Sequence, residues 1–182
     1  SGGDIVTRLV LSLFPGIGLL DMAFEKEGFC VVRGPDLLWG GDIRRFHPPA
    51  GKFDGVIGGP PCQKFSQNTN VDPNGRSSHQ NLIPDFERCI TEAQPKWFVM
   101  ENVKQAPIPL VKGYLNQEFL LNNRWFGEAQ NRVRRFTVGQ CSSITAKLVI
   151  EMVALEHIDW EPAVTGSSGG ARKHPIPGRA RI

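Results

Sequence analysis

The sequence is poor in cysteine, with four among its 182 residues, and it has no long hydrophobic run. These cysteines are widely spaced and match neither paired metal ligands nor a disulfide framework: they are Cys30, Cys62, Cys89 and Cys141. No apolar stretch approaches the roughly 20 residues needed to cross a bilayer, and no basic start leads into a signal-like core. We therefore expect no metal site, no membrane partner and a reducing compartment, namely the cytoplasm.

Excess charge of either sign is also small. The formal net charge is +3, and a composition of 40% hydrophobic and 21% charged residues is ordinary for a globular domain. The length suffices for one domain with its own core. Two stretches without acidic residues, Arg132 to Arg135 and Arg172 to Arg181, would suit a polyanion, although a solvated basic face explains them equally well.

Short apolar segments alternate with amphipathic ones, and there is no internal repeat. The pattern predicts strands at Leu9–Phe14, Phe29–Val32, Phe53–Gly58, Trp97–Met100 and Arg135–Val138. Helical spacing runs from Leu19 up to Gly28 and again over Leu82–Ala93. Strands that alternate with helices imply an α/β fold with a mainly parallel, two-sided sheet.

The most informative segment is Gly58–Ser66, which reads GGPPCQKFS and directly follows an apolar strand. Sites in α/β proteins lie at the carboxyl ends of such strands. Most isolated cysteines are buried small hydrophobes. Here two glycines permit close approach of a ligand, two prolines fix the chain before Cys62, and polar residues follow. This arrangement indicates a reactive thiol.

A glycine-rich turn and two acids form a second pattern. Residues 14–18, with the sequence FPGIG, separate a predicted strand from a predicted helix, as in nucleotide-binding turns, although such turns are often only structural. Asp36 follows the next strand, and Asp42 comes six residues later. Taken singly, each acid could equally cap a turn or a helix.

Two further patterns lie near the ends of later strands. Glu101 begins the Glu-Asn-Val sequence that follows an apolar strand, a position that suits a functional acid. The alternative is a structural acid that caps the strand end or forms a salt bridge. Gln130, Arg132 and Arg134 occupy alternate positions, which share one face if the segment is extended. An arginine cluster by itself is more often part of the surface.

Taken in order, these segments resemble the C5-cytosine-specific DNA methyltransferases over Leu9 to Gly139. The resemblance implies a Rossmann-like fold with S-adenosylmethionine as cofactor and S-adenosylhomocysteine as product. Asp36 would hold the ribose hydroxyls and Asp42 the adenine amine, although the family usually places a helix between these two acids. The cofactor-binding residues that it implies are Phe14, Gly16, Gly18, Asp36, Asp42, Ile43, Pro61 and Leu82.

The resemblance also implies the reaction, which is methylation of a flipped cytosine in double-stranded DNA. Cys62 would add to C6 of the base, and Glu101, expected to be a buried and protonated acid, would donate a hydrogen bond to N3. Arg132 and Arg134 would hold the base and its phosphate. Ser66 and Gln130 would contact DNA, and the polar segment 67–80 would close over the extruded base.

In domain terms the resemblance implies a catalytic and cofactor-binding domain over residues 4–139. Residues 140–182 would form an abbreviated target-recognition region and the start of a C-terminal segment whose final motifs are absent. We expect a monomer of bacterial or phage origin, for example from a restriction-modification system. Two alternatives remain open: a transfer-RNA cytosine-C5 methyltransferase, and a non-catalytic partner subunit that binds cofactor or DNA.

Overall fold

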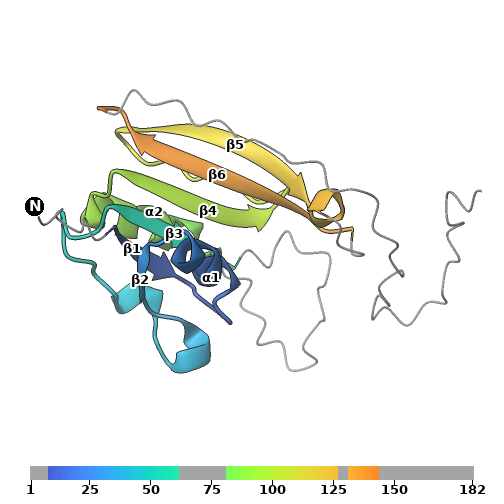
Figure 1. Cartoon of the computed structure of the whole chain (residues 1–182). Coiled ribbons are helices and arrows are strands. Elements are labelled where there is room, and N and C mark those ends of the chain that lie inside the picture. Colours follow the sequence, from blue (N-terminus) through green and yellow to red (C-terminus); the bar gives the residue numbers. More distant parts are fainter. Residues whose placement is uncertain (1–7, 62–80, 127–130, 144–182) are drawn as a thin grey trace, which may run out of the picture.

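The computed structural model describes residues 8–61, 81–126 and 131–143 (Figure 1). The polar segment 67–80 lies outside these residues. The elements in chain order are β1 (Leu9–Leu13), α1 (Leu19–Lys26), β2 (Cys30–Arg33), η1 (Leu37–Trp39), η2 (Ile43–Arg45), β3 (Gly55–Gly58), α2 (Ile83–Ala93), β4 (Trp97–Val103), β5 (Tyr114–Asn122), η4 (Asn123–Phe126) and β6 (Val133–Cys141).

These strands form one sheet in the order β2-β1-β3-β4-β6-β5. The first four strands in this order run parallel, whereas β6 is antiparallel to both β4 and β5. All four residues of β3 are buried, as expected for a strand inside a parallel sheet covered on both faces. The fold is therefore the predicted Rossmann-like α/β architecture, with an antiparallel pair of strands at one end.

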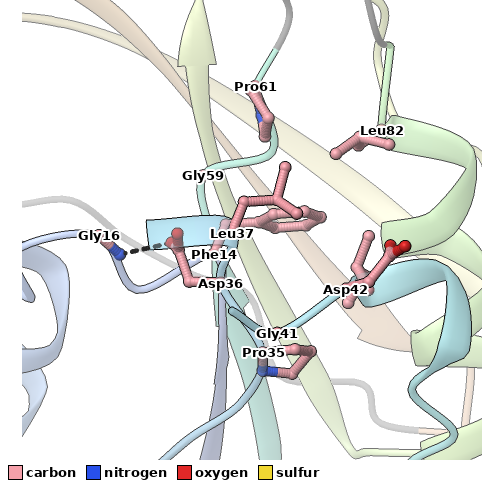
Figure 2. A pocket seen from close by; sticks show the side chains of 11 residues that line it. Phe14, Gly16, Pro35, Asp36, Leu37, Gly41, Asp42, Gly59, Pro61 and Leu82 are labelled. Carbon is pink, nitrogen blue, oxygen red and sulfur yellow. Dashed lines mark hydrogen bonds between the residues drawn. The ribbon is translucent and has the colours of Figure 1, made fainter. Parts of the chain in front are cut away.

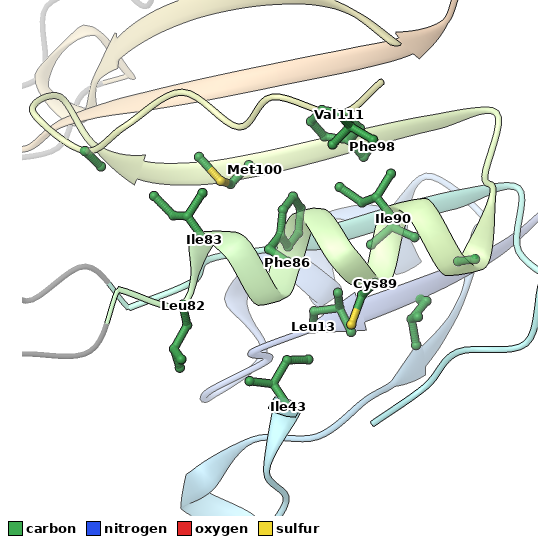
Figure 3. Packing of buried hydrophobic residues seen from close by; sticks show 14 residues of the cluster. Leu13, Ile43, Leu82, Ile83, Phe86, Cys89, Ile90, Phe98, Met100 and Val111 are labelled. Carbon is green, nitrogen blue, oxygen red and sulfur yellow. The ribbon is translucent and has the colours of Figure 1, made fainter. Parts of the chain in front are cut away.

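The two helices contact opposite faces of the sheet. Leu11 and Leu13 of β1 pack in the same core cluster as the buried side of α2. Ser12, which points the other way, bonds to Asp21 of α1. Figure 3 shows α2 lying along the core, where the rings of Phe86 and Phe98 meet edge to face with centroids 5.9 Å apart.

This aromatic contact predicts a large stability effect. Phe86 is fully buried, so Phe86→Ala leaves a cavity and is expected to lower the free energy of unfolding by about 3–5 kcal/mol. Trp39, which is 76% exposed, is the control, and Trp39→Ala should change stability by less than about 0.5 kcal/mol. Denaturant titrations followed by circular dichroism measure both values. Equal losses in the two variants would contradict this description of the core.

The observed strands extend beyond several predicted ones. β4 continues through Glu101 to Val103, and β6 spans nine residues, because β4, β6 and β5 pair along their lengths. Such pairing joins segments far apart in the chain and leaves little local signal. Within the part of the chain that the structure describes, no helix is long and apolar enough to span a membrane.

Candidate functional site

A cavity of about 250 Å³ lies beyond the carboxyl ends of β1, β2 and β3 (Figure 2). This is where ligands bind in open α/β sheets. Its walls combine apolar side chains, two carboxylates and exposed backbone. The lining residues are Phe14, Gly16, Pro35, Asp36, Leu37, Gly41, Asp42, Ile43, Gly59, Pro61 and Leu82.

The turn after β1 forms one wall through an unusual backbone. Phe14, Gly16 and Gly18 all have positive φ angles, of 56°, 52° and 80°. A non-glycine residue in this region costs roughly 1–3 kcal/mol, and such strain gathers at functional sites. The amide of Gly18 donates to the carbonyl of Pro15 at 2.7 Å and closes the turn. This conformation of the turn places Phe14 and the backbone of Gly16 in the cavity wall.

Asp36 joins this turn to the end of β2. One carboxylate oxygen accepts the amide of Gly16 at 2.9 Å, the bond drawn in Figure 2, and the other accepts the amide of Leu38 at 2.8 Å. Asp36 therefore caps η1, as the structural alternative suggested. Each carboxylate oxygen has two lone pairs, so capacity for a hydroxyl donor remains. Capping and ligand binding are compatible at this residue.

No α-helix separates Asp36 from Asp42, yet both acids line the same cavity. The short η1 and a glycine turn stand where the family usually has a helix. A Cβ on Gly41 would lie 2.9 Å from the Cα of Pro35 and 3.0 Å from the amide nitrogen of Asp36. Only glycine permits this close approach, which brings the chain back so that Asp42 faces the cavity.

Asp42 is bound tightly by Arg44. Its carboxylate accepts the Arg44 amide at 3.0 Å, Nε at 2.9 Å and Nη2 at 2.8 Å. These side-chain and backbone hydrogen bonds hold the pKa of Asp42 below its ordinary value. Asp42 is therefore a carboxylate at neutral pH and can accept a hydrogen bond from an amine.

All the predicted cofactor-binding residues except Gly18 line this cavity. Gly18 instead lies against the guanidinium of Arg33. The residues suit an adenosine group, because Phe14, Leu37 and Leu82 provide apolar contact for a flat base. The two carboxylates suit hydroxyl and amine donors. Sequence reasoning missed four lining residues, whose one signal is adjacency to predicted ones: Pro35, Leu37, Gly41 and Gly59.

A second cluster, Glu101 with Arg134, lies near the carboxyl end of β4. Arg134 Nε is 3.1 Å from Glu101 Oε1, across the antiparallel β4–β6 pair. We expected a buried Glu101, but its side chain is 30% exposed. The reason is the alternation of β4, because α2 covers the face that bears Met100 and Asn102, and Glu101 points to the opposite, partly covered face.

Three arginines lie in or just before β6, but they do not act as one group: Arg132, Arg134 and Arg135. Arg134 is partly buried, and burial together with the charge of Arg132 lowers its pKa, whereas Glu101 acts in the opposite direction. Arg132 is exposed. Arg135 points to the other face, is only 8% exposed, and donates to the carbonyls of Lys104 and Ala106. Arg135 thus supports the chain after β4, whereas Arg134 pairs with Glu101 and Arg132 is an exposed cation whose charge acts on Arg134.

The cavity and the Glu101–Arg134 pair meet at the segment after β3. A Cβ on Gly59 would lie 3.6 Å from Glu101 Oε2. The buried Asn102 donates its amide to the carbonyl of Pro60 at 3.0 Å, a role that sequence reasoning did not assign. The chain that leads to residue 62 is therefore held beside Glu101.

Three predicted site residues lie outside the described part of the chain: Cys62, Ser66 and Gln130. Pro61, the last described residue before Cys62, lines the cavity. Among residues 8–61, 81–126 and 131–143, no group of three or more His, Cys, Asp or Glu side chains could hold a metal ion.

Comparison with known proteins adds a family to this geometry. Residues 40–107 match the model of the C-5 cytosine-specific DNA methylases. The chain is 32% identical over 163 residues to the type II methyltransferase M.FnuDI of Fusobacterium nucleatum, covering 71% of this chain and 46% of that protein. It is also 32% identical over 164 residues to M.NgoPII of Neisseria gonorrhoeae, covering 71% of this chain and 47% of that protein. The chain thus spans about half the length of these relatives.

Solved structures share the fold at lower identity. A protein encoded within an E. coli prophage, described as a DNA modification methyltransferase, aligns with a TM-score of 0.61 and 22% identity, over 79% of this chain and 49% of that one. DNMT2 of Spodoptera frugiperda aligns with a TM-score of 0.55 and 20% identity, over 76% of this chain and 51% of that one. The chain therefore shares the fold of these two methyltransferase structures.

Proposed function

Since this chain belongs to the C-5 cytosine-specific DNA methylase family, we propose that it is an enzyme, or the catalytic part of one, that methylates C5 of a flipped cytosine in double-stranded DNA. The observation that carries the proposal is the meeting of two sites at one segment. Gly59 and Pro61 line the cavity, and Gly59 also borders the Glu101–Arg134 pair. Residue 62, a cysteine, follows directly.

The cavity residues would hold S-adenosylmethionine. We assign the ribose hydroxyls to Asp36 and the adenine amine to Asp42, with apolar contact from Phe14, Ile43 and Leu82. When bound, this cofactor supplies an electrophilic methyl group. Asp42 is oriented by its hydrogen bonds from Arg44, and Asp36 by two backbone amides, so both acceptors are positioned before the cofactor arrives.

The residues around Gly59 would activate the base. The Cys62 thiolate adds to C6 of cytosine, forming a carbon–sulfur bond and making C5 nucleophilic. C5 could then accept the methyl group that the cofactor supplies, which would leave S-adenosylhomocysteine, and loss of the C5 proton to a base would expel the thiolate and restore the ring. Glu101 would bond to the N3 edge of the cytosine, and Arg134 would hold Glu101 in place. Arg132, Ser66 and Gln130 would contact the DNA backbone or the extruded base.

Asp42→Asn is expected to weaken binding of S-adenosylhomocysteine by about 10- to 100-fold, because a hydrogen bond to a charged acceptor is worth about 1.5–3 kcal/mol. Isothermal titration measures the change. Asp54→Asn is the matched control, since Asp54 pairs with Lys96 before β3, at the opposite edge of the sheet, and its loss should leave affinity unchanged. Equal affinities in the Asp42 variant and wild type would contradict the assignment of Asp42.

The function is tested by incubating the chain with methyl-labelled S-adenosylmethionine and mixed-sequence duplex DNA. Label retained on DNA and recovered as 5-methylcytosine after nuclease digestion supports the proposal. A parallel reaction with transfer RNA tests the RNA alternative, which predicts labelling of RNA in preference to DNA. Cofactor binding without labelling of either polymer would instead favour a binding subunit or the need for a further segment, because the chain spans about half of its relatives.

A DNA substrate also suggests a biological role and a cellular location for the protein. The bacterial type II methyltransferases among its relatives suggest a restriction-modification role in a bacterial or phage-infected cell, where DNA lies in the cytoplasm. We propose that the chain acts as a monomer, and sedimentation of the purified protein with and without duplex DNA tests this.

A further inference from the structure

One buried charged group has no part in the proposed reaction. Asp21 lies in the first turn of α1 with 1% of its surface exposed. One carboxylate oxygen accepts the Ser12 hydroxyl at 2.5 Å, and the other accepts Arg33 Nε at 3.0 Å. Ser12 belongs to β1 and Arg33 to β2, so three elements meet at one carboxylate.

Packing does not explain this burial. Asp21 is the one buried residue of α1, whereas Leu19 and Met22 of the same helix are 68% and 47% exposed. A buried carboxylate is costly unless hydrogen bonds and an opposite charge compensate it. The helix N-terminus also favours a negative charge in its first turn. The sequence therefore retains an acid at a position where an apolar residue would ordinarily be buried.

Ser12, Asp21 and Arg33 lie next to the glycine turn 14–18. Ser12 and Arg33 are register partners in the parallel β1–β2 pair, at the carboxyl ends of both strands. Arg33 Nη2 would lie 2.8 Å from a Cβ on Gly18, so the guanidinium packs against the backbone of that glycine. Gly18 has a φ of 80°, and its carbonyl accepts the Met22 amide at 2.9 Å, which begins α1.

The turn is thus held at two points. Asp36, which lines the cavity, accepts the Gly16 amide, and Arg33, which does not line the cavity, contacts Gly18. A turn with three positive φ angles has little intrinsic preference for one shape, and its neighbours must determine it. Phe14 and Gly16, which line the cavity, belong to this turn.

We propose that Ser12, Asp21 and Arg33 form a positioning network that sets the conformation of turn 14–18 and so the affinity of the cavity for its nucleoside cofactor. This inference rests on the proposed cofactor. None of the three side chains lines the cavity, so the network acts through the backbone of Gly18 rather than by touching the ligand.

The test compares Arg33→Met with Lys26→Met, which removes an exposed cation in the last turn of α1 that forms no ion pair with Asp21. S-adenosylhomocysteine affinity is measured by isothermal titration, and thermal unfolding is recorded on the same samples. Arg33→Met is expected to raise the Kd about tenfold, a coupling of ordinary size, and Lys26→Met to change it less than twofold. Arg33→Lys, which keeps a cation near Asp21, should give an intermediate Kd.

Several outcomes separate the explanations. A lower unfolding temperature with an unchanged Kd in Arg33→Met means that the network only stabilises the fold, and the inference is overturned. Asp21→Asn keeps the shape of the side chain and serves as a second variant, and its effect on Kd should not add to that of Arg33→Met if both act through one network. Wild-type protein that fails to bind the cofactor analogue would overturn both the proposed cofactor and this inference, whereas binding that is insensitive to both variants would overturn only the inference.

Discussion

Cys62→Ser is expected to reduce methyl transfer to DNA below detection while leaving cofactor affinity unchanged. The thiolate is the attacking species in the proposed reaction, and a hydroxyl in its place is far less ionised and far less nucleophilic at neutral pH. The described chain before residue 62 supports this assignment, since Pro61 lines the cavity and the carbonyl of Pro60 is bonded to Asn102.

The positions of the other thiols strengthen the prediction. Cys30 begins β2, and the amide of Cys141 bonds to the carbonyl of Lys96 just before β4, so both lie at the sheet edge opposite the cavity. Cys89 is fully buried in α2, and burial raises the pKa of its thiol to about 11. Cys62 is the remaining cysteine in the sequence, and it follows the carboxyl end of the parallel strand β3, whereas Cys141 ends the antiparallel β6.

Cys141→Ser is the matched control for this experiment. Cys141 is partly exposed, and hydrogen bonds from Ser143 lower its pKa, so its thiol is a suitable competitor to test against Cys62. We expect full activity in Cys141→Ser and trapping of a covalent complex with 5-fluorocytosine DNA only when Cys62 is present. Undiminished labelling in Cys62→Ser, or its loss in Cys141→Ser, would contradict the mechanism.

Glu101→Gln is expected to lower the rate of methyl transfer by about 10²- to 10⁴-fold, the usual contribution of a positioned acid or base. Glutamine keeps the shape of the side chain, but its amide can neither carry the charge nor exchange the proton of a carboxyl group. It also leaves the partly buried Arg134 without its counter-ion. The affinity for S-adenosylhomocysteine should not change, because Glu101 does not line the cavity.

The neighbouring acid Glu118 provides the control for Glu101. Glu118 of β5 lies 3.8 Å from Arg135 across the antiparallel β5–β6 pair, on the opposite face of the sheet, so it is also a glutamate paired with an arginine of β6. Single-turnover rates of Glu101→Gln and Glu118→Gln, at saturating DNA and cofactor, measure the difference. Similar rates in the two variants would mean that Glu101 has no special part in the chemistry.

Much of the architecture was predictable because its signals are local. The apolar runs that became β1 and β3, the glycine turn before α1 and the apolar face of α2 are each contained within a dozen residues. The carboxyl ends of parallel strands meet at one edge of the sheet, so the residues that follow these strands could be expected near one another before any coordinates were known. Phe14, Asp36, Asp42 and Pro61 line one cavity for this reason.

Contacts between distant segments could not be predicted in this way. Arg134 and Arg135 are adjacent and chemically identical, yet one pairs with Glu101 and the other supports the chain after β4. Their difference arises from the register of β6 against β4, which assigns alternate residues to opposite faces. The antiparallel β5 and the role of Asn102 depend on the same long-range pairing.

The sequence by itself determined the α/β class, which residues follow the carboxyl ends of the parallel strands, and which residue types are available for chemistry. These features follow from hydrophobic spacing and short motifs. Only the tertiary structure decided which charges meet. It joined Asp21 to Ser12 and Arg33, and Glu101 to Arg134. Charge pairing acts over a few ångströms in space and leaves no fixed spacing along the chain, so it is determined only when the sheet register and the turns are in place.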